Sequence, residues 1–189
     1  MLLTIVSAIV STLVKHVTNC VLDNFSSVKI EGAPSWYMKP VDGEVCVYTY
    51  DYGDYSSVDR AKTKARMKMI KKVNGLIDVV IYENAPKFNQ SKEIELMNRF
   101  KKDDNINLFI DRALKYEKVE YYKDKHEAFV RACIPSQILI AYEKNRLENI
   151  RKQVVKYKSD EAFDELEGGV NDAAGTNDAF DELEESTKN

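Results

Sequence analysis

Histidine and glycine are scarce in this chain, and their scarcity argues against several classes of enzyme. The 189 residues contain two histidines, His16 and His126, with no CxxC, HExxH or H-x-H spacing, so the sequence predicts no metal site. Seven glycines leave little for a phosphate-binding loop, and no GxSxG elbow is present. A nucleophile built from Cys133 and His126 would lack a visible activating partner. We therefore expect a non-enzymatic protein without cofactor or metal.

Cysteine is also sparse, and the three cysteines are an odd number. If Cys20 carries a lipid, Cys46 and Cys133 remain as a possible disulfide. Both lie in predicted strands, where two buried thiols acting as small apolar side chains are the alternative. The composition favours the two buried thiols over the disulfide.

Positive charge is nearly missing from the C-terminal residues 159–189. Residues 159–189 hold eleven acidic side chains and one lysine, whereas the preceding 158 residues carry 27 basic and 20 acidic side chains. The formal net charge of -3 thus combines a basic body with an acidic tail. The tail has little apolar bulk to bury, which predicts disorder over 159–189.

The tail contains a repeat. DEAFDELE begins at Asp160 and NDAFDELE at Asn177. Each copy keeps a Phe and a Leu three residues apart, a pattern typical of a short helix that binds a groove in a protein partner. These predicted contact residues are Phe163, Leu166, Phe180 and Leu183. A duplicated solubilising tail without a partner is the alternative.

The first fourteen residues, MLLTIVSAIVSTLV, lack charge altogether. They are too short to span a bilayer, which takes roughly 20 residues, and match the apolar region of a signal peptide. We expect a signal peptide over 1–19, lipid attachment at Cys20 and a tether over 20–33. An N-terminal helix packed on the domain is the alternative.

Residues 34–158 predict one α+β domain. Its expected strands are 44–52, 76–82, 118–122 and 128–134, and its expected helices are 58–73, 91–102, 106–115 and 136–158. Asn74 and Gly75 favour a helix end before the second strand. In the order β-α-β-α-β-β-α, these elements indicate a small, mainly antiparallel sheet packed against two or three helices.

The stretch GAPSWYMKP, residues 32–40, places the single tryptophan between two prolines. Pro34 and Pro40 restrict the backbone and predict a stiff, non-helical arm. Pro34, Trp36 and Tyr37 are therefore candidates for fastening this arm to the helix layer or to a neighbouring subunit.

The first predicted helix is strongly basic. Its basic residues are Arg60, Lys62, Lys64, Arg66, Lys68, Lys71 and Lys72. Such density can attract an anionic surface, and a solvated helix face is the alternative. Since no aromatic stacking platform accompanies the helix, we expect no nucleic-acid binding.

These features together resemble the Lpp-twenty-like family of epsilonproteobacterial outer-membrane lipoproteins, which includes the flagellar relative FlgP. The matching positions are Cys20, Pro34, Ser35, Trp36, Ala61, Ala65 and Arg66, with the expected strand at 76–82. The resemblance implies a lipid-anchored envelope protein without catalytic residues, a surface antigen or a building block of a flagellar disk.

The sequence thus predicts an outer-membrane lipoprotein with a structural, assembly or adhesive role. Its expected partners are further copies of itself or another envelope protein, with the membrane reached through the lipid on Cys20. The alternative is a soluble, cytoplasmic interaction protein that uses the basic helix for an anionic surface and the acidic repeats for a protein partner.

Overall fold

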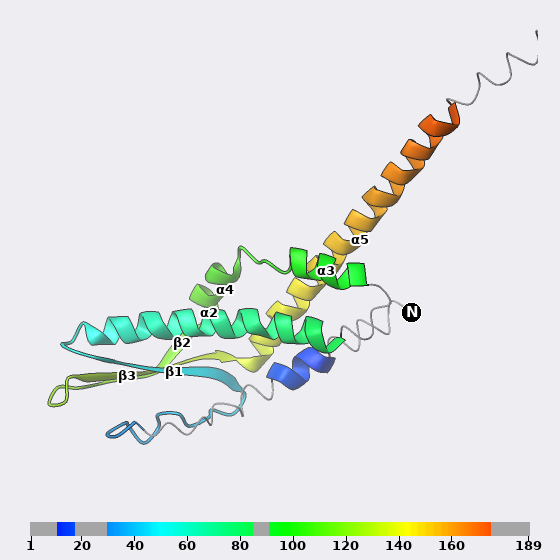
Figure 1. The fold of residues 1–189 in the computed structure, drawn as a ribbon. Coiled ribbons are helices and arrows are strands. Elements are labelled where there is room, and N and C mark those ends of the chain that lie inside the picture. The colour runs from blue at the N-terminus through cyan, green and yellow to red at the C-terminus, as the bar shows by residue number, and fades with distance from the viewer. Residues whose placement is uncertain (1–10, 18–29, 85–90, 175–189) are drawn as a thin grey trace, which may run out of the picture.

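The computed structural model describes residues 11–17, 30–84 and 91–174 and has an α+β fold (Figure 1). One antiparallel sheet has the order β1-β3-β2, with β1 at Glu44–Tyr52, β2 at Lys115–Tyr122 and β3 at Glu127–Pro135. The labelled helices are α2 (Ser57–Asn84), α3 (Ser91–Phe100), α4 (Ile106–Ala113) and α5 (Ser136–Ala174), and residues 11–17 are also helical. The predicted α+β class is confirmed.

The two faces of the sheet have different covers, as expected when strand residues alternate between faces. On one face, apolar side chains of β1 and β3 share a buried cluster with α2; they are Val45, Val47, Val130, Ala132 and Ile134. On the other face, Cys46, Tyr48 and Cys133 pack against side chains of residues 30–43, which we call the arm. Figure 1 shows α2 and the arm on opposite sides of the sheet.

The predicted strand at 76–82 is wrong, because α2 continues without a break to Asn84. Its buried side chains keep helical spacing through the whole element: Val58, Ala61, Ala65, Met69, Val73, Leu76, Ile77, Val80 and Ile81. The apolar run therefore extends the stripe that begins at Val58, and packing along this stripe outweighs both β-propensity and the break expected at Gly75.

The second half of the chain follows the prediction more closely. The two helices α3 and α4 are confirmed, as is the hairpin, whose strands β2 and β3 pair antiparallel. Strand β3 ends at Pro135 and α5 begins at Ser136. A bulge interrupts the β2–β3 register between Tyr116 and Lys118.

The end of α5 corrects the predicted tail. We expected the helix to stop at about Lys158 with disorder beyond it, but α5 runs to Ala174 and projects from the domain (Figure 1). Ion pairs join the beginning of this part to α3: Lys158 binds Glu93, and Lys92 binds Glu161 at 2.6 Å. The first DEAFDELE copy is therefore helical, and the second lies outside the described residues.

A substitution at Gly75 tests the continuity of α2. An added Cβ at this position meets no atom within 4 Å, so Gly75→Ala should stabilise the helix by about 0.5–1 kcal/mol. Urea unfolding measures the change. Destabilisation by alanine would instead support a left-handed helix end at this residue.

Candidate functional site

The arm crosses the sheet and contacts all three strands. Tyr37 packs edge-to-face on Tyr48 of β1 and Phe129 of β3, with ring centroids 5.8 and 5.1 Å apart. Trp36 reaches β2, where its indole N–H donates to Glu120. Pro34 is buried. The arm thus lies on the sheet, not on the helix layer, and it contains successive turns in place of the expected stiff extension.

A guanidinium group also contacts Trp36. The Arg131 guanidinium of β3 lies 5.7 Å from the centre of the indole ring, a distance suited to cation–π attraction. The half-buried indole is therefore held at its edge by a carboxylate and on its face by a cation.

A disulfide joins Cys46 of β1 to Cys133 of β3 beneath the arm. The two residues are direct partners in the strand register, and their Cα atoms are 4.1 Å apart. The preference for two buried thiols is therefore wrong. Register explains the pairing, since it places side chains 87 residues apart in sequence directly opposite each other.

The disulfide also bears on metal binding and catalysis. Within the described ranges, the group with clustered metal-ligand atoms is Glu44, Cys46 and Cys133, whose ligand atoms lie within 4.8 Å of one another. Both sulfurs are bonded to each other and offer no thiolate. Cys133 is likewise no nucleophile in this state, and His126 lies exposed at the hairpin turn.

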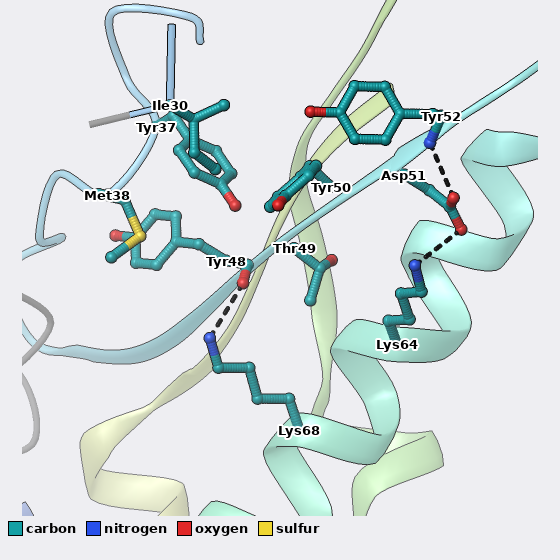
Figure 2. A pocket seen from close by; sticks show the side chains of 10 residues that line it. All are labelled: Ile30, Tyr37, Met38, Tyr48, Thr49, Tyr50, Asp51, Tyr52, Lys64 and Lys68. Carbon is teal, nitrogen blue, oxygen red and sulfur yellow. Dashed lines mark hydrogen bonds and ion pairs between the residues drawn. The ribbon is translucent and has the colours of Figure 1, made fainter. Parts of the chain in front are cut away.

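A groove of about 580 Å³ lies between the arm, β1 and α2 (Figure 2). Aromatic rings form much of its wall, from Tyr37, Tyr48, Tyr50 and Tyr52, and Lys64 and Lys68 of α2 enter from the other side. Tyr50 and Tyr52 are 37% and 54% exposed. The groove therefore offers an accessible aromatic surface.

Three titratable groups of this groove, Tyr37, Tyr48 and Asp51, are poorly suited to acid–base catalysis. Burial raises the pKa of Tyr37 far above its ordinary value, and burial also raises the pKa of Tyr48 although Arg131 opposes the shift. For Asp51, burial alone would raise the pKa, but hydrogen bonds from Lys64 and the Tyr52 N–H, with the charges of Lys64 and Arg60, lower it. At neutral pH both tyrosines are protonated and Asp51 is ionised, so none is near its pKa.

Four basic residues of α2 cover the free edge of β1, and we call them the basic ladder. Three of them donate to strand oxygens: Arg60 to Tyr52, Lys68 to Tyr48 and Lys72 to Cys46, at 2.7, 3.2 and 3.4 Å. The fourth, Lys64, binds the Asp51 carboxylate at 3.0 Å.

The spacing of the basic ladder matches the strand. Four helix residues rise about 6.0 Å, close to the ~6.7 Å covered by two strand residues. Arg60, Lys68 and Lys72 therefore reach main-chain oxygens on the free edge of β1, whereas Lys64 binds the Asp51 side chain instead. An edge covered by cations resists pairing with another chain.

The remaining predicted anion-binding residues have other neighbours. Arg66 binds Asp111 of α4 at 2.6 Å, Lys62 lies 5.8 Å from the centre of the Tyr116 ring, and Lys71 is exposed. Six of the seven basic residues thus contact groups of this chain. They do not form one free cationic face.

Sequence reasoning missed a buried ion pair on α5. Glu143 is 0% exposed and faces Arg146, with an N–O distance of 3.4 Å. Arg146 also donates to the Lys101 carbonyl at 2.6 Å and to Asn74 of α2 at 3.2 Å. A signal was present, because Leu139 and Leu147 are eight positions apart and position 143, midway between them, lies on the same helical face.

The predicted terminal features are only partly described. Leu13 and Val17 of the segment 11–17 are fully buried, and His16 pairs with Glu83 of α2 at 2.7 Å. Phe163 and Leu166 are 63% and 66% exposed on the projecting part of α5. The predicted lipid site Cys20 and the second-copy residues Phe180 and Leu183 lie outside the described residues.

No protein-family model, curated protein sequence or solved structure matches the chain. The resemblance to the Lpp-twenty-like family therefore remains a prediction. Among the helices of the described residues, none has the length and apolar character needed to cross a membrane.

Trp36→Phe tests the attachment of the arm. The variant keeps an aromatic ring but loses the hydrogen bond to Glu120, so we expect a loss of about 1–2 kcal/mol in the free energy of unfolding. Urea unfolding followed by circular dichroism measures it. Glu120→Gln retains an acceptor and should lose less. Equal stability of Trp36→Phe and the wild type would show that this bond does not hold the arm.

Glu143 should make stability depend on pH. Burial raises its pKa from 4.5 to about 7, although the charge and hydrogen bond of Arg146 lower it. The folded state binds the proton more tightly, so this stability is present below pH 4.5 and is lost as pH rises through 7. We expect the wild type to lose up to about 3 kcal/mol by pH 8.

Glu143→Gln removes this titration and should flatten the profile, as measured by urea unfolding between pH 5 and 8. Glu148→Gln, at an exposed site on the same helix, is the matched control and should retain the wild-type slope. Identical slopes for all three proteins would show that Glu143 ionises without cost.

Proposed function

We propose that this chain is an exported, non-enzymatic protein of the cell envelope, anchored at the outer membrane through a lipid on Cys20, with a structural or assembly role. The Cys46–Cys133 disulfide carries the proposal. Disulfides persist in oxidising compartments, whereas the cytosol keeps thiols reduced. The uncharged N-terminal stretch and the family resemblance support the same compartment.

The surfaces of the domain support an assembly role over catalysis. In the aromatic groove, Tyr37, Tyr48 and Asp51 have pKa values shifted away from neutral pH. The buried Arg146, paired with Glu143, joins α5 to α2 and to the chain before α4. The acidic projecting part of α5 presents Phe163 and Leu166 to solvent. Exposed apolar side chains on an acidic helix suit contact with a basic-rimmed groove of another protein.

One observation favours the alternative, a protein that keeps its N-terminus as part of the domain. Cleavage before Cys20 would remove Leu13 and Val17, which are fully buried here. In that alternative the segment 11–17 is a permanent core element, and the chain binds partners without a lipid anchor.

The number of free and disulfide-bonded cysteines in the protein purified from its own cells tests the proposal. Free thiols are alkylated during lysis, and the intact mass is measured before and after reduction. We expect two cysteines to react only after reduction, and a mass that lacks residues 1–19 and includes acyl chains.

The other outcomes are equally informative. Alkylation of all three cysteines before reduction would overturn export. An intact disulfide in an unprocessed, unacylated chain would favour the alternative. Cys46→Ser is the control, because it leaves Cys133 without its disulfide partner and must raise the number of thiols alkylated before reduction.

A further inference from the structure

The two edges of the sheet differ in how they are protected. The basic ladder covers the outer edge of β1, with three of its members bound to main-chain oxygens. In the part of the chain that the structure describes, no side chain is hydrogen-bonded to the main chain of Tyr116 or Val119 in β2. Strand β2 is therefore the edge open to pairing.

The register shows which groups of β2 point outward. Lysines reach the main-chain oxygens of Cys46 and Tyr48. The main-chain N–H and C=O groups of these two residues therefore point away from β3, toward the free edge of β1. Because hydrogen-bonding direction alternates along each antiparallel strand, the β1–β3 and β2–β3 registers leave Tyr116 and Val119 with their N–H and C=O groups on the free edge.

The bulge brings Tyr116 and Val119 into equivalent positions. In a regular strand, residues three apart point to opposite faces and opposite edges. The extra residue between Tyr116 and Lys118 restores the alternation, so Tyr116 and Val119 share one edge and one face. Both side chains are accessible, at 41% and 38% exposed.

The exposed sequence of β2 is complementary to itself. Residues 115–120 read Lys-Tyr-Glu-Lys-Val-Glu, and reversing the order sets each Lys opposite a Glu and the Tyr opposite the Val. On the helix face, Tyr116 meets Val119. On the arm face, Lys115 meets Glu120, whose carboxylate also accepts from Trp36 and Tyr122. Glu117 and Lys118 meet next to the centre. Opposite charges and aromatic–β-branched pairs are favourable cross-strand neighbours.

We infer that β2 pairs antiparallel with β2 of a second copy, about a two-fold axis between Glu117 and Lys118 perpendicular to the sheet. The two sheets then form one continuous six-stranded sheet with both α2 helices on the same side. This inference deepens the proposed assembly role by naming the partner as a second copy of the chain. The contact involves only one strand from each copy. Because such an interface is small, we expect weak association that depends on protein concentration.

Charge reversal at the centre tests the register. Glu117→Lys places lysine opposite Lys118 of the second copy, and Lys118→Glu places glutamate opposite Glu117. Each change acts twice through the symmetry, so we expect at least about tenfold weaker dimerisation in either single variant. The double variant restores both pairs and should return to within about threefold of the wild type. Sedimentation equilibrium of the full chain gives the dimerisation constants of the wild type, the two single variants and the double variant.

Val119→Pro tests the backbone contact. It removes an N–H that points away from β3, and proline is tolerated at such positions of edge strands. The variant should be folded and monomeric, whereas Val119→Thr, which keeps the N–H, should still dimerise. The control for the charge reversals is Lys144→Glu. It changes the net charge by the same amount as Lys118→Glu, but at an exposed site on α5, and should leave dimerisation unchanged.

The inference fails if the wild type remains monomeric at the highest soluble concentration, or if the double variant is no better than the single ones. The proposed compartment is judged separately, by thiols and mass. A monomer with an intact disulfide and an acylated Cys20 would contradict the strand pairing but not the export proposal. A dimer with reduced thiols would contradict the export proposal but not the strand pairing.

Discussion

Close packing of α2 on the sheet is the constraint on which the other surfaces depend. Ala61 and Ala65 of this helix are fully buried. Their small side chains let the helix approach the strands closely. The approach brings Arg60, Lys68 and Lys72 within reach of β1 oxygens. One helix thus covers a face of the sheet and protects one of its edges, and the opposite edge is left as the available surface.

Local sequence signals predicted the elements that are stabilised locally. The hairpin, α3, α4 and the start of α5 follow from turn residues and helical periodicity within short windows. The run at 76–82 misled because a β-branched apolar stretch fits a buried strand and a buried helix equally well. Only the continuation of spacing from Met69 and Val73 distinguishes them. Likewise, the contacts of α5 at Lys158 and Glu161 are with Glu93 and Lys92 of α3, which is distant in sequence and outside any local window.

The candidate site was predictable in its parts and not in its contacts. The sequence marked Trp36 as an anchor, but its acceptor lies 84 positions away, on a strand that the pattern could not align with the arm. The same holds for the disulfide, which depends on strand register. Charge density could not reveal that the basic helix faces a strand edge, because lysines beside solvent and lysines beside carbonyl oxygens have the same spacing.

The separation of β1 from its partner has a consequence for how the chain folds. Strand β3 follows β2 after a short turn, so this hairpin can form early and locally. Strand β1 must instead close a loop of close to ninety residues, since Cys46 and Cys133 are 87 positions apart, and such closure slows folding. β1 therefore emerges first during synthesis and joins the sheet late. Until it does, β3 has an open edge, and that interval is when aggregation and mispairing compete with native assembly.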